Sequence, residues 1–99
     1  MTFDLFLIWY FIVGFLLGNG VPHFAFGAAG KVFRSPFGQR SSPSANVLWG
    51  LSNFVAATVV SIALSWLGEY DAYSLAVLLI GFWLTVAMFG TRIKLFLNE

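Results

Sequence analysis

The sequence predicts an all-α integral membrane protein with three transmembrane helices, an N-out, C-in orientation and a structured cytoplasmic loop between the first two helices. Of its 99 residues, 60% are hydrophobic and 9% are charged, against about 45–50% and about 25% in soluble domains. The mean hydropathy is +0.88. A soluble chain of this size exposes more surface than so few charged side chains can cover. We therefore expect a single membrane domain over residues 1–99.

The first apolar run predicts a transmembrane helix over residues 3–20. It carries one charge, Asp4, at its outer end, and it is slightly shorter than the roughly 20 residues that a span needs. A cleaved signal peptide is the alternative, because Gly18-Asn19-Gly20 resembles a small-x-small cleavage site. The start of the chain lacks the Lys or Arg of a signal peptide, which favours the transmembrane helix.

Two further apolar runs without charge predict transmembrane helices over residues 46–67 and 72–91. Trp49 and Trp66 lie near the ends of the first of these runs, as expected for rings at the membrane interface. The link between the two runs is so short that we expect the helices to be antiparallel neighbours. Residues 92–99 are predicted to form a short cytoplasmic tail.

The charged residues predict the orientation in the membrane. Three spans place the loop at 21–45 and the tail on the same side, and this side carries every basic residue of the chain: Lys31, Arg34, Arg40, Arg92 and Lys94. The other side carries Asp4, Glu69 and Asp71. By the positive-inside rule the basic side is cytoplasmic. The net charge of +1 is too small to indicate nucleic-acid binding.

Small and polar residues predict where the helices pack, because close backbone approach and interhelical hydrogen bonds hold membrane helices together. Such residues recur at spacings of three and four along the second helix. The predicted packing residues are Gly14, Gly18, Asn46, Gly50, Asn53, Ala57, Ser61, Gly81 and Thr85. We expect the second helix to be central, and we expect the amide of Asn53 to have a hydrogen-bond partner within the membrane.

Residues 21–45 are predicted to form an interfacial loop, because four phenylalanines in a free linker would favour association. Pro22 is expected to open a short helix there. The predicted contacts with anionic lipid headgroups or with a partner are His23, Lys31, Arg34 and Arg40. The segment Gly27-Ala28-Ala29-Gly30-Lys31 lacks the spacing, the hydroxyl residue and the preceding strand of a nucleotide-binding phosphate loop.

No catalytic, cofactor-binding or metal-ligating set is predicted. The chain has no cysteine and a single histidine, His23, and no carboxylate lies near it in sequence or topology to complete a zinc site or a triad. His23 is a candidate metal or haem ligand, a candidate proton-transfer group, or a polar residue that pairs with a carbonyl or a lipid phosphate; the last is the preferred interpretation. No span has an ionisable residue at its middle, which disfavours a proton-coupled transporter.

One group of motifs resembles a group of small uncharacterised bacterial membrane proteins. The motifs are Asn19-Gly20-Val21-Pro22-His23-Phe24, then Gly30, Ser35-Pro36-Phe37, Ser41-Ser42-Pro43 and Asn46-Val47-Leu48-Trp49-Gly50. The resemblance covers about the middle third of the chain. It implies a bacterial inner-membrane location and brings no activity, cofactor or residue role.

The residues leave three classes of function open. The prediction is a non-enzymatic accessory, assembly or regulatory subunit of a larger membrane complex, with the lipid bilayer and other membrane subunits, or further copies of the chain, as partners. The second class is a homo-oligomeric channel or small transporter, with a holin-like pore as a variant, in which Asn46, Asn53 and Ser61 line the pathway. The third is an enzyme that acts on lipid headgroups through His23 and the basic residues of the loop.

Overall fold

Three helices form most of the structure, a computed structural model that describes residues 5–67 and 71–97. The helices are α1 (Leu5–Ala28), α2 (Pro43–Leu67) and α3 (Ala72–Phe96). All three are long and apolar enough to cross a membrane, which confirms the prediction of three helices of spanning length. At about 1.5 Å per residue, each is longer than the roughly 30 Å of a bilayer's hydrocarbon core.

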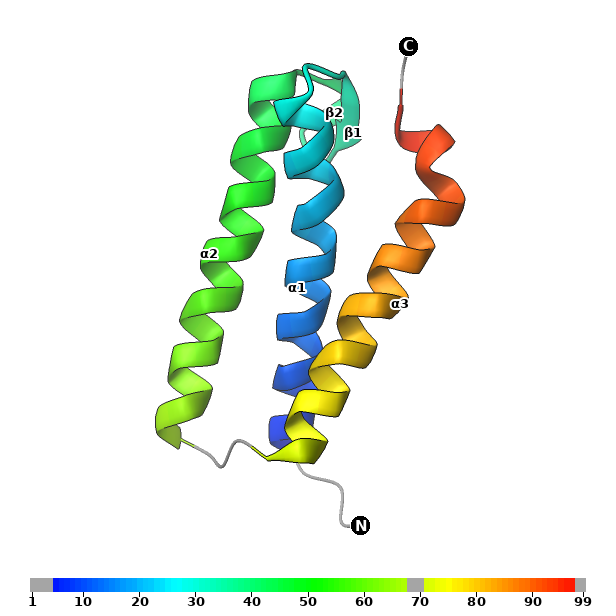
Figure 1. Ribbon diagram of the computed structural model, residues 1–99. Helices are drawn as coiled ribbons and strands as arrows, with labels where there is room; N and C mark the ends of the chain where they lie inside the picture. Colours follow the sequence, from blue (N-terminus) through cyan, green and yellow to red (C-terminus); the bar gives the residue numbers. More distant parts are fainter. Residues whose placement is uncertain (1–4, 68–70, 98–99) are drawn as a thin grey trace.

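Helix α1 lies between α2 and α3 (Figure 1). It packs along both neighbours, whereas α2 and α3 make few contacts with each other. The predictions that the second helix is central and that α2 and α3 pack as neighbours are therefore wrong. The reason lies in α1, which has small residues on two sides: Gly14 and Gly18 face α3, while Gly20 and Gly27 face α2.

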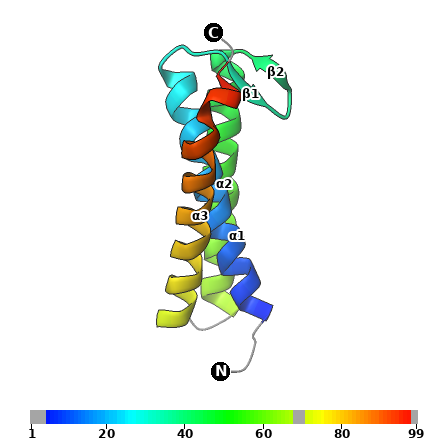
Figure 2. The same cartoon turned by 90° about the vertical axis from the view of Figure 1, so that its right-hand side faces the viewer.

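A short hairpin, which the all-α prediction missed, closes one end of the three helices (Figure 2). Its strands are β1 (Phe33–Ser35) and β2 (Gly38–Ser41), which pair antiparallel with Phe33 opposite Ser41. Phe33 also forms a bridge to Leu97, directly after α3. Strand β1 contacts all three helices, so the hairpin is a packed part of the fold.

The boundaries of the helices differ from those predicted. Helix α1 does not end at residue 20 but continues to Ala28, with Pro22 inside it. The Gly, Pro and His residues after position 18 have the composition of a loop, but here the glycines among them allow α1 to approach α2 closely. A Cβ added to Gly27 would stand 2.6 Å from the carbonyl oxygen of Pro43. The segment that was predicted as a loop at 21–45 is therefore shorter in the structure, because its first residues belong to α1.

The other two helices also extend beyond their predicted bounds. Helix α2 begins at Pro43 rather than at residue 46, in line with the tolerance of proline in a first helical turn. Helix α3 continues beyond residue 91 to Phe96 and is kinked at Arg92, where φ is −122° and ψ is 15°. The residues predicted as a tail thus begin inside a helix.

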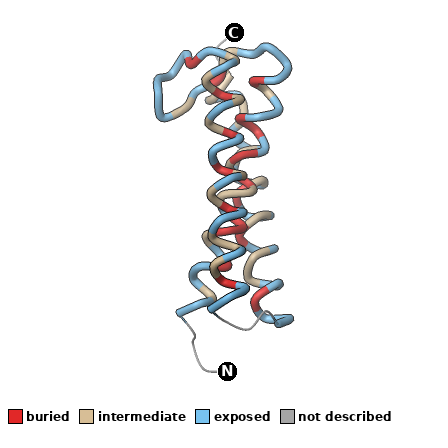
Figure 3. Tube along the Cα trace, turned by 90° about the vertical axis from the view of Figure 1, so that its left-hand side faces the viewer, coloured by how far each residue is buried: buried red, intermediate tan, exposed pale blue. Residues whose placement is uncertain are grey.

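The buried residues form a narrow band along the faces where the helices meet (Figure 3). Tyr10, Val13, Ala57 and Leu64 form an apolar cluster within this band. Only 33%, 22% and 17% of the residues in the most apolar stretches of α1, α2 and α3 are buried. Large apolar side chains such as Trp83 face outward. Small residues inside and bulky apolar residues outside are typical of helices that pack in lipid.

The glycine contacts give a test of this packing. A methyl group added at Gly14 would overlap the backbone carbonyl of Leu78, and a backbone atom has no rotamer by which to move away. We expect Gly14→Ala to lower the free energy of unfolding by about 1–3 kcal/mol, measured by denaturant titration in detergent micelles with circular dichroism. The matched control is Gly90→Ala on α3, where a Cβ meets nothing within 4 Å; equal loss in both variants would contradict the packing.

Candidate functional site

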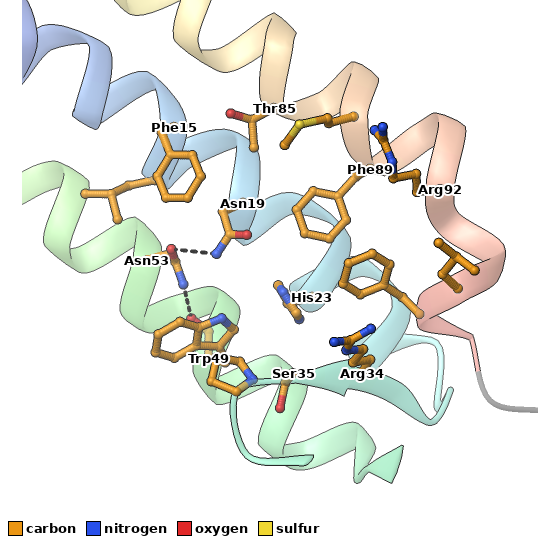
Figure 4. A pocket seen from close by; sticks show the side chains of 15 residues that line it. Phe15, Asn19, His23, Arg34, Ser35, Trp49, Asn53, Thr85, Phe89 and Arg92 are labelled. Atoms are coloured by element: carbon orange, nitrogen blue, oxygen red, sulfur yellow. Dashed lines mark hydrogen bonds between the residues drawn. The ribbon is translucent and has the colours of Figure 1, made fainter. Parts of the chain in front are cut away.

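A cleft of about 860 Å³ opens beside α1, at the hairpin end of the molecule (Figure 4). Helices α2 and α3 flank α1 and contact each other little, so their side chains line the cleft from two sides. Its volume lies within the range of about 300–1,000 Å³ that is usual for small-molecule sites. The lining residues are Phe15, Leu16, Asn19, His23, Arg34, Ser35, Pro36, Trp49, Asn53, Thr85, Met88, Phe89, Arg92, Leu95 and Phe96.

His23 lies among these residues (Figure 4), and Asn46 of α2 contacts its ring. His23 Nδ1 is 2.8 Å from Asn46 Oδ1. Asn46 Nδ2 donates to the carbonyl oxygens of Phe33 (2.7 Å) and Ser42 (3.2 Å), so the amide oxygen is the atom that faces the ring, and it only accepts. Nδ1 therefore carries the proton. In the neutral ring, this leaves Nε2 as a hydrogen-bond acceptor.

Asn46 connects three parts of the fold. It belongs to α2, it accepts from His23 of α1, and it donates to β1 through the Phe33 carbonyl. Its side chain is completely buried. The ring of Phe33 stacks on those of Phe26 and Phe96 and meets the edge of His23 at 5.2 Å between centroids. The position of His23 is thus set by polar contacts on one side and by aromatic rings on the other.

A second polar pair lies closer to the middle of the helices. Asn19 Nδ2 donates to Asn53 Oδ1 at 3.0 Å, and Asn53 Nδ2 donates to the carbonyl oxygen of Trp49 at 2.8 Å. Asn19 is thus the partner that the sequence predicted Asn53 to have. The Nε1 of Trp49 is buried and has no hydrogen-bond partner within residues 5–67 and 71–97. Trp49 and His23 both line the cleft.

Two arginines give the cleft its charge. Arg34 comes from β1, and Arg92 comes from the kink in α3. The Arg34 guanidinium carbon lies 5.8 Å from the centroid of the Phe96 ring, within the range of a cation–π contact. In the part of the chain that the structure describes, neither arginine forms an ion pair, and no Asp or Glu lines the cleft. This end of the cleft thus attracts anions.

The structure brings together only some of the residues that the sequence predicted for a contact site. His23 and Arg34 line the cleft, whereas Lys31 and Arg40 are exposed and do not line it. Sequence reasoning did not assign Arg92 to a site. The signal for it was its position directly after an apolar run, on the same predicted side as the basic loop.

The predicted packing residues lie mostly at the interfaces between helices. The buried ones are Gly14 and Gly18 on α1, Asn46, Gly50, Asn53 and Ala57 on α2, and Gly81 and Thr85 on α3. Ser61 is half-buried. Tyr10, Val13, Gly20 and Gly27 are also buried and were not predicted. The two glycines lie in the stretch after Gly18 whose composition indicated a loop.

No protein-family model, curated protein or solved structure gives a significant match to this chain. Within the described residues, no group of three or more His, Cys, Asp or Glu side chains is placed to hold a metal ion. The cleft combines apolar walls with two arginines and with the side chains of Trp49 and His23.

The contacts of Asn46 give a second test. Asn46→Ala would leave His23 Nδ1 and the Phe33 carbonyl without their partner, at a cost of about 1–3 kcal/mol for each buried group. We expect a lower free energy of unfolding and faster hydrogen–deuterium exchange across the hairpin, residues 33–41. The matched control is Ser52→Ala, an exposed residue of α2 that bonds only within its own helix. Unchanged exchange in the hairpin would show that Asn46 does not hold it.

Proposed function

We propose that this chain is a non-enzymatic integral membrane protein that acts by binding, as an accessory, assembly or regulatory subunit of a larger membrane complex. The observation that carries the proposal is the cleft beside α1. Its two arginines provide positive charge, and His23 provides a hydrogen-bonding group. No carboxylate is present among the described residues that line the cleft. Such a set suits recognition of an anion or an amphiphile.

We further propose an N-out, C-in orientation in the inner membrane of a bacterium. Support comes from the basic residues, which lie after α1, in the hairpin and in the last turns of α3, all at one end of the molecule. This end is cytoplasmic by the positive-inside rule. The bacterial location rests on the resemblance of the loop motifs. Asp4, Glu69 and Glu99 lie outside the described residues.

Asp71 supports the same orientation from the opposite end. Its carboxylate caps α3 by accepting from the backbone nitrogen of Ser74 at 2.9 Å and from Ser74 Oγ at 3.0 Å. These bonds hold the pKa of the Asp71 carboxyl below its usual value, so the group is charged at neutral pH. A negative charge at a helix N-terminus is also favoured by the helix dipole.

The other two classes of function find less support. A pore requires the side chains of Asn46 and Asn53 to face a pathway. Both side chains are instead buried and form hydrogen bonds to α1 or to the hairpin of the same chain. An enzyme acting through His23 would gain from a carboxylate that orients and charges the imidazole. Here the group on Nδ1 is the neutral amide of Asn46.

The orientation is testable with single cysteines, because the chain has none of its own. Gln39→Cys places a thiol in the exposed hairpin, and Ala72→Cys places one at the exposed start of α3. We expect a membrane-impermeant maleimide to label Ala72→Cys in intact spheroplasts and Gln39→Cys only after lysis. The reverse pattern would give the opposite orientation, and labelling of both in intact spheroplasts would exclude three spans.

The subunit role is testable by purification from native membranes in polymer nanodiscs, followed by mass spectrometry. We expect the full chain to copurify with the same larger membrane complex at a fixed stoichiometry in repeated preparations. As the matched control, an unrelated three-span protein expressed at the same level should not capture that complex. Recovery of only the 10.9 kDa chain with lipid would contradict the subunit role.

A further inference from the structure

We infer that the cleft beside α1 binds one anionic phospholipid with a hydroxylated headgroup. Its phosphodiester lies between Arg34 and Arg92, a headgroup hydroxyl donates to His23 Nε2, and an acyl chain follows the apolar wall toward Phe15. The inference rests on the membrane placement in the proposed function and not on the subunit role.

The first argument is the division of the cleft into a charged part and an apolar part. Arg34 of β1 and Arg92 at the kink of α3 both line the part of the cleft near the hairpin, from two different elements (Figure 4). Phe15 lies about two helical turns from His23 along α1, in the opposite direction from the hairpin. A phospholipid in a bilayer has the same division along its length, with its phosphate at the interface and its chains toward the midplane. Basic pockets between membrane helices bind lipid headgroups in this way.

The second argument is the hydrogen bonding inside the cleft. His23 lines the cleft, and its Nε2 is the acceptor because Nδ1 carries the proton and donates it in a hydrogen bond to Asn46 Oδ1. No residue in the described part of the chain donates to Nε2. A polar atom in an apolar surrounding is stabilised by a partner. A phosphate diester oxygen carries no proton to donate, so the partner is a hydroxyl of the headgroup.

The third argument is charge complementarity, which favours a lipid over a second copy of the chain. A second copy in the same membrane orientation would bring its own hairpin end to this depth. That end carries Lys31, Arg40 and Lys94 in addition to the two arginines of the cleft. Like charges in this position repel each other. An anionic lipid instead offsets the charge of Arg34 and Arg92.

The experiment uses the purified full chain in detergent with four defined probes, and native mass spectrometry counts what stays bound. The probes are phosphatidylglycerol, phosphatidylmethanol, phosphatidylcholine of the same acyl chains, and free glycerol phosphate. Phosphatidylmethanol keeps the charge but lacks the hydroxyl. We expect one phosphatidylglycerol per chain, bound about tenfold or more tightly than phosphatidylcholine and about fivefold more tightly than phosphatidylmethanol.

The arginines are tested with a matched pair of variants on α3. Arg92→Gln removes a charge that lines the cleft, and Lys94→Gln removes an exposed charge that does not. We expect Arg92→Gln to weaken phosphatidylglycerol binding by about fivefold and Lys94→Gln by less than about twofold. Arg34→Gln is a second variant with the same expected loss, and circular dichroism checks that each variant keeps its helices.

Several outcomes would overturn the inference. Equal losses in Arg92→Gln and Lys94→Gln would show general attraction of anionic lipids to a basic surface. Equal binding of phosphatidylglycerol and phosphatidylcholine would exclude a charge-selective site, and equal binding of phosphatidylmethanol would remove the role of His23. Glycerol phosphate bound as tightly as the lipid would identify a free phosphate, and a lipid-free dimer would identify a second copy. The cysteine-labelling and copurification experiments test the proposed function separately, so a negative result there can be told apart from a failure of lipid binding.

Discussion

Close contact between backbones at the glycines of α1 determines the architecture. Gly14 and Gly18 bring α1 against α3, and Gly20 and Gly27 bring it against α2. In lipid, where burial of apolar surface gives little drive for helices to associate, such contacts supply the dispersion energy that holds helices together. Because both neighbours pack on α1, they contact each other little, and the cleft opens between them.

The polar residues inside the helices have a separate role. Membrane hydrocarbon offers no water to an amide or an imidazole, so each must find a partner within the chain. Asn46 and Asn53 do so with His23 and Asn19, across the α1–α2 contact. These bonds fix the register of two helices whose glycines alone would permit sliding. The bond to Asn46 also orients the ring of His23, which lines the cleft.

Hydrophobicity and charge predicted the membrane class and the number of helices, because both depend on composition summed over long runs. The arrangement of the helices was not predicted, since small residues occur on all three and their spacing does not say which helix is central. The end of α1 was missed because Asn19, Gly20 and Pro22 have the composition of a loop, and only the contact with α2 makes them helical. Within the site, His23 and Arg34 were predicted from residue type. Arg92 required the three-dimensional structure, since a kink in α3 and a strand far away in sequence bring it to the same cleft.

The central position of α1 has a consequence for how the chain assembles during synthesis. Translation proceeds from the N-terminus, so α1 is made before α2 and α3. Each later helix then enters a membrane that already contains its packing surface, and neither has to wait for the other. The bridge between Phe33 and Leu97, which joins the end of α3 to the hairpin, cannot form until α3 has been synthesised. Completion of the aromatic cluster around His23 is therefore coupled to insertion of the final helix.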